Sequence, residues 1–205
     1  MSVRYSSFGS LANNCCLIVD DATNKSALVD CTEYSQKMLD LIGDTDLEYI
    51  LLTHGHYDHI TGAKQIKEQF GCKIAVSQQD APMLTSARHS LAVFMGGEQN
   101  NCEPDIIIND GDIITLGETE IKVISTPGHT KGSVCFIAGD SLFSGDTLFK
   151  MSCGRTDFPG GSWEEMQQSL KKLSELDGDM KVYTGHDSIT SLDFERKNNI
   201  YMKNL

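Results

Sequence analysis

Three histidines and an aspartate fall within six consecutive positions of this 205-residue chain. They are His54, His56, Asp58 and His59, and they directly follow the apolar run 49–52. Imidazole and carboxylate groups are costly to bury without partners, and both are ordinary ligands of a borderline cation such as zinc. We therefore expect a fold in which the end of a buried strand meets a metal-binding point.

Three further candidate ligands occur in the same kind of place. His129, Asp146 and His186 each lie just past the end of a predicted strand, and each is preceded by a glycine. Loops at one edge of a sheet can converge on one point, and glycine lets the backbone bend sharply there. Of the six histidines, only His89 stands outside such a setting, and we interpret it as an ordinary loop residue.

The spacing of these residues indicates two ions rather than one. In an extended segment, His54 and His56 project to the same side and can bind one ion. Asp58 and His59 begin the following helix and can face a second ion. Paired cations about 3.5–4 Å apart are standard in hydrolytic sites, where they lower the pKa of a shared water. With His129 and His186 added, one site has three nitrogen ligands and the other has Asp, His and His, and Asp146 can bridge the two ions.

The pattern of apolar residues predicts an α+β fold in which strands dominate. Short strand-like segments occur at 15–19, 26–29, 49–52, 73–76, 106–108, 113–116, 120–125, 133–138, 141–144 and 181–183. Helical spacing occurs at 33–41, 60–70 and 162–176, while 78–103 is ambiguous and predicted as helix and loop. Because each helix has one apolar face, we expect the helices to cover the outside of packed sheets. No linker interrupts the pattern, so a single domain over 1–205 is expected.

Charge and cysteine content narrow the class of protein. A formal net charge of -12 argues against binding nucleic acid through its phosphates, which needs a face rich in Lys and Arg. The seven cysteines are odd in number and form no Cys-x-x-Cys pair, which favours reduced thiols over disulfides or a sulfur-ligated zinc. With no signal-peptide pattern and no apolar run of membrane-spanning length, we expect a cytoplasmic protein with no membrane partner.

Four motifs together resemble those of the metallo-β-lactamase-fold hydrolases, over nearly the whole chain. They are Thr-His-Gly-His-Tyr-Asp-His at 53–59, Pro-Gly-His-Thr at 127–130, Ser-Gly-Asp-Thr at 144–147 and Thr-Gly-His at 184–186. The resemblance implies a four-layer αββα sandwich with the metals at one edge of the two sheets. It also implies a first site of His54, His56 and His129, a second site of Asp58, His59 and His186, and Asp146 in the bridging position. The expected cofactors are two divalent ions, with zinc as first choice and iron or manganese as alternatives.

The segment 153–162 resembles the glyoxalase II-like branch, whose members hydrolyse thioesters such as hydroxyacyl-glutathione. In that branch the comparable stretch carries a basic residue and, two positions on, a tyrosine, and both touch glutathione. Arg155 fits the first role as a donor to a substrate carboxylate, whereas Asp157 departs from the second. A salt bridge between Arg155 and Asp157 that holds the loop is the alternative. The chain also ends at Leu205, without the helical C-terminal extension that helps to hold glutathione in that enzyme, so recognition of glutathione stays open.

The expected reaction is hydrolysis of a small-molecule thioester or related acyl compound by a hydroxide that bridges the two ions. Asp58 is predicted to bind metal and also to orient that hydroxide. No strong general acid is required, because a thiol pKa near 8.5 makes the thiolate a good leaving group.

Two other functions are open at this point. The segment starting at Cys153 also resembles the persulfide dioxygenases of the same superfamily, which would use a single iron on His54, His129 and Asp146. A non-catalytic protein that kept the fold is the other possibility, and the complete set of ligand residues argues against it.

Overall fold

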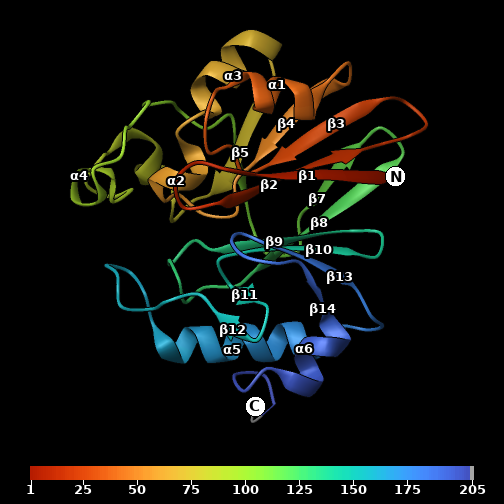
Figure 1. The fold of residues 1–205 in the computed structure, drawn as a ribbon, viewed down its shortest axis with the longest axis vertical. Helices are drawn as coiled ribbons and strands as arrows, with labels where there is room; N and C mark the ends of the chain where they lie inside the picture. Colours follow the sequence, from red (N-terminus) through yellow and green to blue (C-terminus); the bar gives the residue numbers. More distant parts are fainter. Residues whose placement is uncertain (204–205) are drawn as a thin grey trace.

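Two six-stranded sheets form the centre of the computed structural model, which describes residues 1–203. Helices α1 and α3 cover the outer face of the first sheet, and α5 and α6 cover the outer face of the second (Figure 1). The predicted α+β fold, a four-layer αββα sandwich, is therefore confirmed.

The first sheet is built from the N-terminal half in the order β1-β2-β3-β4-β5-β6. The first three strands pair antiparallel and the last three pair parallel to β3 and to one another. Their bounds are β1 (Ser2–Phe8), β2 (Asn13–Val19), β3 (Lys25–Val29), β4 (Asp46–Leu51), β5 (Lys73–Ser77) and β6 (Ile106–Ile108).

The second sheet has the order β14-β13-β10-β9-β8-β7, in which only β10 and β13 are parallel. Its strands are β7 (Ile113–Leu116), β8 (Thr119–Ser125), β9 (Val134–Ala138), β10 (Ser141–Gly145), β13 (Lys181–Thr184) and β14 (Thr190–Ser191). A small hairpin of β11 (Leu148–Phe149) and β12 (Ser152–Cys153) stands apart from both sheets.

The helices are short. They are α1 (Gln36–Ile42), α2 (Tyr57–Ile60), α3 (Ala63–Phe70), a 3-10 turn (Ala81–Thr85), α4 (Ala92–Met95), α5 (Trp163–Ser174) and α6 (Leu192–Asn198). Ser162 caps α5 by accepting a hydrogen bond from the Glu165 amide, as its capping-box pattern predicts. Among the residues described, no helix is long and apolar enough to cross a membrane.

Strand β2 shows how the layers are held together. It is buried along its whole length because its two faces enter two different cores. Cys15, Leu17 and Val19 pack against the outer helices, whereas Cys16 and Ile18 join the core between the sheets. This alternation follows the two-residue period of a strand.

Three local features differ from the sequence prediction. Strand β1 was not predicted, since its residues are mostly exposed and give no apolar pattern. The predicted helix 60–70 is two helices, because the Gly62 amide donates to the Cys31 carbonyl at 2.9 Å and does not continue the helical hydrogen bonding. The C-terminal β14 and α6 also lie outside the predicted elements.

Candidate metal centre

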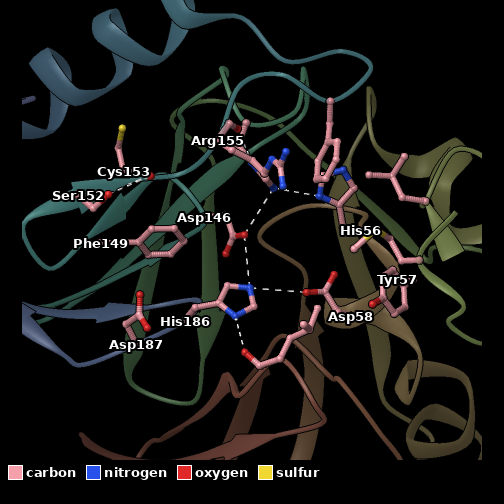
Figure 2. Close-up of a pocket in the computed structure, with 15 residues that line it drawn as sticks. His56, Tyr57, Asp58, Asp146, Phe149, Ser152, Cys153, Arg155, His186 and Asp187 are labelled. Atoms are coloured by element: carbon pink, nitrogen blue, oxygen red, sulfur yellow. Dashed lines mark hydrogen bonds and ion pairs between the residues drawn. The ribbon is translucent and has the colours of Figure 1, made fainter.

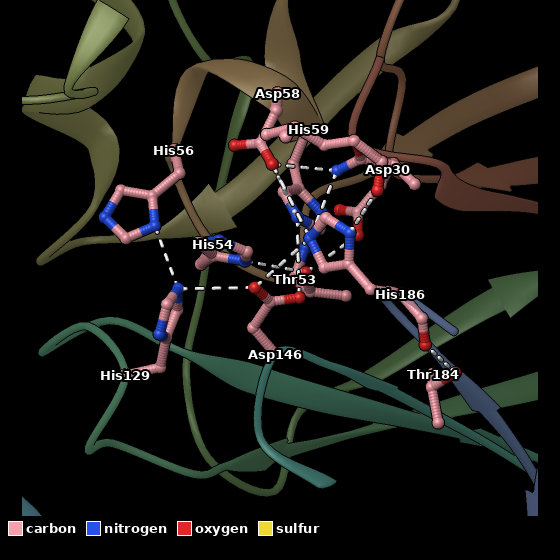
Figure 3. Close-up of polar contacts among 12 residues, drawn as sticks. Asp30, Thr53, His54, His56, Asp58, His59, His129, Asp146, Thr184 and His186 are labelled. Atoms are coloured by element: carbon pink, nitrogen blue, oxygen red, sulfur yellow. Dashed lines mark hydrogen bonds and ion pairs between the residues drawn. The ribbon is translucent and has the colours of Figure 1, made fainter. Parts of the chain in front are cut away.

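The structure brings all seven predicted ligand residues together at one edge of the sandwich. The loop after β4 carries His54 and His56, and helix α2 carries Asp58 and His59. The loops after β8, β10 and β13 carry His129, Asp146 and His186. Figure 3 shows these side chains converging, with Asp146 in contact with both His129 and His186. His89 lies outside this group.

The convergence produces three overlapping groups, in each of which the potential ligand atoms lie within 4.8 Å of one another. They are His54, His56 and His129; His54, His59 and Asp146; and Asp58, His59 and His186. The first and third match the two predicted sites, and the second joins them through Asp146. We call the first group the trihistidine half and the third the Asp58 half.

Distances within the cluster suit shared cations. His56 Nδ1 lies 2.9 Å from His129 Nε2, and Asp146 Oδ2 lies 3.4 Å from His129 Nε2. On the other side, His186 Nε2 lies 3.5 Å from both Asp146 Oδ2 and Asp58 Oδ2. Potential metal-binding atoms from different side chains thus lie within 3.5 Å of one another.

Unpaired buried atoms supply a direct test of whether the residues fit a metal. His54 Nε2, His59 Nε2 and Asp146 Oδ1 are buried and have no hydrogen-bond partner among the described residues. Buried polar atoms normally have partners, so these three need one. Nitrogen and carboxylate oxygen are the ligands that zinc and iron accept, and the cluster therefore fits divalent cations. That these residues bind metal stays a prediction.

Asp30 fixes the two histidines at the centre of the cluster, and the sequence analysis did not single it out. Its carboxylate accepts hydrogen bonds from Thr53 N and Thr53 Oγ1, both at 2.8 Å, and from His59 Nδ1 at 2.9 Å. Thr53 Oγ1 then lies 3.1 Å from His54 Nδ1. Both rings are thereby held by Nδ1, which leaves Nε2 to face the centre. The only sequence signal is a charge at the end of the buried strand β3.

Backbone carbonyls hold the two histidines from the second sheet in the same way. His129 Nδ1 donates to the Arg155 carbonyl at 2.8 Å, and His186 Nδ1 donates to the Leu11 carbonyl at 3.0 Å. A carbonyl can only accept, so each Nδ1 carries the proton and each Nε2 faces the other side chains of the cluster.

Asp80 ties the first metal loop to the His129 loop and was also missed by the sequence analysis. This buried carboxylate accepts from Gly55 N at 3.0 Å, Thr130 Oγ1 at 2.7 Å and Gly132 N at 3.0 Å. Burial raises the pKa of Asp80, although its hydrogen bonds oppose the shift. A lone aspartate between β5 and a 3-10 turn carries no recognisable motif.

Electrostatics separate the two halves of the cluster. Burial, with added repulsion from neighbouring histidines, lowers the pKa of His54 well below its ordinary value and that of His56 to about 3. Burial opposes protonation of His59 too, but the carboxylates of Asp146, Asp58 and Asp30 outweigh it and raise its pKa to about 10.

Charged neighbours also shift the pKa values of His186 and Asp146. His186 is partly buried, yet its hydrogen bond to Asp146 raises its pKa. Burial would raise the pKa of Asp146, but His59 and the other surrounding histidines hold it well below the usual range.

A cavity of about 520 Å³ opens above the cluster, a volume typical of small-molecule sites. Asp58, Asp146 and His186 point toward one another within it (Figure 2). Its apolar wall comes from Leu11, Leu91, Met95, Phe149 and Phe158. Arg155, which the sequence predicts to bind substrate, also lines the cavity. Its role in binding stays a prediction.

Comparison with known proteins identifies the family. The family model described as the metallo-beta-lactamase superfamily matches residues 9–186. This chain belongs to that superfamily. A Haemophilus influenzae protein named hydroxyacylglutathione hydrolase GloC is 32% identical over 209 residues, covering 98% of each chain. That relative supports the glyoxalase II-like branch of the superfamily.

Two solved structures of similar chains complete the comparison. The crystal structure of TTHA1623 in a di-iron-bound form is 28% identical, with a TM-score of 0.86 over 97% of this chain and 99% of its own. The crystal structure of ETHE1 from Myxococcus xanthus is also 28% identical, with a TM-score of 0.81 over 98% of this chain and 84% of its own.

The cysteines take no part in the cluster. All seven are free thiols, and five are buried. Burial raises the pKa of Cys15 to about 12 and that of Cys135 to about 11, which keeps both protonated. They behave as small apolar side chains, as their apolar neighbours in the sequence predict.

Proposed function

We propose that this member of the superfamily is a dinuclear metal-dependent hydrolase that cleaves thioesters. The observation that carries the proposal is the cluster itself: seven His and Asp side chains, several with buried unpaired atoms, at the base of a cavity of ligand size. The relative named hydroxyacylglutathione hydrolase supports thioesters as the substrate class.

The residues present would hold one divalent ion on His54, His56 and His129 and another on Asp58, His59 and His186, with Asp146 between them. When bound, two such ions supply an acidified water and polarise the carbonyl of the substrate. Zinc is our first choice, and the di-iron form of TTHA1623 supports iron as the alternative.

Side chains of this protein would position the attacking water. Asp58 lines the cavity and is held by Asn13, whose Nδ2 donates to Asp58 Oδ2 at 3.0 Å. Its carboxylate can therefore also accept a hydrogen bond from the attacking water and set its direction. The thiol part of the substrate would leave as a thiolate, which requires no strong general acid.

The same relative also supports glutathione thioesters as one substrate class. The alignment with this Haemophilus influenzae protein, named hydroxyacylglutathione hydrolase, covers 98% of that chain as well as of this one. The proposal concerns the thioester bond and does not name the thiol.

The test is metal analysis followed by assays on a panel of acyl thioesters. About two ions per chain and metal-dependent release of free thiol are expected, and His54→Ala should abolish that release. Thiol release that survives His54→Ala, or that needs no metal, would contradict the proposal.

A mononuclear iron persulfide dioxygenase is the second candidate, and the structural similarity to ETHE1 keeps it open. Its iron would lie on His54, His129 and Asp146. One iron per chain with oxygen uptake on glutathione persulfide, and no thiol release from thioesters, would favour it over hydrolysis. A cytoplasmic location stays a prediction.

A further inference from the structure

The small hairpin of β11 and β12 forms one wall of the cavity above the metal centre. Phe149, Ser152 and Cys153 of this hairpin line the cavity (Figure 2). The Phe149 ring lies edge-on to the His186 ring, with 6.0 Å between the ring centroids. The position of the hairpin therefore sets the shape of the cavity beside the candidate metal centre.

The turn of this hairpin contains an unfavourable backbone conformation. Met151, which lies between β11 and β12, has a φ of 61°. A side chain disfavours this left-handed region, whereas glycine adopts it freely. The hairpin pairs only Leu148 with Cys153 and Phe149 with Ser152, and so short a two-stranded ladder is not stable by itself. A non-glycine residue keeps such a conformation only where its surroundings fix it.

A buried carboxylate supplies part of that support. Glu195 of helix α6 is fully buried, and its Oε2 accepts a hydrogen bond from the Met151 amide at 2.8 Å. Its other oxygen, Oε1, accepts from Thr190 Oγ1 at 2.6 Å. Glutamate is rarely buried completely unless hydrogen bonds compensate the loss of water. One of the compensating hydrogen bonds of Glu195 is the one that fixes the hairpin turn.

Asn199 holds the two strands on either side of the turn. It directly follows α6 and is also fully buried. Its Nδ2 donates to the Ser152 carbonyl and to Glu195 Oε2, both at 2.9 Å, and lies 3.4 Å from the Phe149 carbonyl. Neither Glu195 nor Asn199 lines the cavity, so the hairpin is held from the side away from the substrate.

We propose that Glu195 and Asn199 are positioning residues for the reaction, which hold the hairpin so that Phe149 and Ser152 form a fixed wall against the substrate. The inference rests on the proposed thioester hydrolysis. Because neither residue reaches the cavity, both act on the substrate through the hairpin. A wall that contacts the substrate equally in the ground state and the transition state changes KM and leaves kcat unchanged.

The first test compares two variants of Glu195 in the metal-loaded protein, with S-acetylglutathione as the substrate. Glu195→Ala should raise KM about tenfold, the size of one hydrogen bond, with kcat and metal content unchanged. Glu195→Gln should keep KM close to that of the unaltered protein. Its Oε1 can still accept from the Met151 amide while its Nε2 donates to Thr190 Oγ1.

Two substitutions of Met151 test the contact from its other end. Met151 is 46% exposed, so neither change disturbs the core. Met151→Pro removes the amide donor and forbids a positive φ, and it should raise KM as Glu195→Ala does. Met151→Gly in the Glu195→Ala background should recover part of the loss, because glycine adopts this conformation without strain.

Two further variants separate positioning from loss of stability. In a Phe149→Ala background, Glu195→Ala should raise KM much less, since the side chain through which it acts is absent. Met38→Ala is the control, because it removes a fully buried side chain from α1, on the outer face of the first sheet. It should lower stability with KM unchanged.

Hydrogen exchange of the Met151 amide tests the same contact without the reaction. The amide should be protected in the unaltered protein and in Glu195→Gln, and should exchange at least about tenfold faster in Glu195→Ala. Nuclear magnetic resonance of the metal-loaded protein would measure this.

Three results would overturn the inference. An unchanged KM in Glu195→Ala and Met151→Pro would do so, as would equal exchange of the Met151 amide in Glu195→Ala and the unaltered protein. If the metal-loaded protein hydrolysed no thioester, the proposed function would be overturned and this inference with it, whereas the first two results leave thioester hydrolysis intact. If Glu195→Ala does not fold, Met151→Pro decides.

Discussion

The two halves of the metal centre are built from similar residues but differ in charge. In the trihistidine half, burial lowers the pKa values of His54 and His56, so these rings are neutral. In the Asp58 half, carboxylates raise the pKa of His59 to about 10, so a proton occupies a position that a cation would take, and the pKa of His186 is raised as well. The trihistidine half can therefore accept a metal directly, while the Asp58 half must first release the proton of His59.

Asp146 is the residue that should affect both halves, and its loss should have the largest effect. Its carboxylate approaches His59 at 3.5 Å, His129 at 3.4 Å and His186 at 3.5 Å. Asp146→Asn should lower kcat/KM for a thioester by about a thousandfold or more and reduce the binding of both ions. Elemental analysis with parallel kinetics would measure this, using Asp177→Asn as control. A variant that keeps two tightly bound ions would show that Asp146 does not join the halves.

Substitution of a single histidine should remove the ion of one half and leave the ion of the other. His56 belongs to the trihistidine half only, and His186 to the Asp58 half only. We expect His56→Ala and His186→Ala each to lose one ion of two and to lower kcat/KM about a hundredfold. Metal titrations with a chromophoric chelator would count the remaining ion. Loss of both ions in both variants would mean that the centre loads as one unit.

Sequence reasoning found the residues of the cluster, the candidate ligands, but not the groups that hold them. His54 to His59 form a dense local motif, and the strand-end position of His129 and His186 made them recognisable. Asp30 and Asp80 are single aspartates whose partners are brought close only by folding, so no spacing along the chain marks them. The αββα layers followed from apolar patterns and family resemblance, whereas the exposed edge strand β1 has no such pattern.

The pH dependence of metal binding should distinguish the halves further. Below about pH 10 a cation must displace the proton on His59, so the affinity of the Asp58 half should rise about tenfold per pH unit for each proton released. The affinity of the trihistidine half should vary little between pH 6 and 9, because His54 and His56 are already neutral imidazoles in that range. Calorimetry in buffers of different ionisation enthalpy would count the protons. Equal proton release at both sites would contradict the comparison.

The same shift has a consequence for folding of the metal-free protein. The pKa of His59 is raised above the value of about 6.5 for an unfolded chain. Its contribution to the free energy of unfolding is therefore complete below about pH 6.5 and is lost as pH rises through about 10. Urea unfolding of chelator-treated protein should show this decline, and metal-loaded protein should not, since the cation replaces the proton.

The smallest predicted effect concerns Asn13, which supports only the Asp58 half. Asn13 is fully buried, and its Nδ2 donates to Asp58 Oδ2 at 3.0 Å, while its own Oδ1 has no hydrogen-bond partner among the described residues. Removing the donor in Asn13→Ala frees the Asp58 carboxylate to rotate. Affinity for the ion of the Asp58 half should fall about tenfold, the usual size for a group that orients a ligand.

Two measurements separate this positioning role from simple packing. Affinity for the ion of the trihistidine half should stay the same in Asn13→Ala, and Asn13→Ser, which retains a shorter donor, should recover part of the loss. Equal weakening of both ions, or no difference between the alanine and serine variants, would show that Asn13 acts through general packing. In that case Asn13 would play no part in the difference between the halves. That difference would depend only on the titrating groups of the cluster and on Asp30.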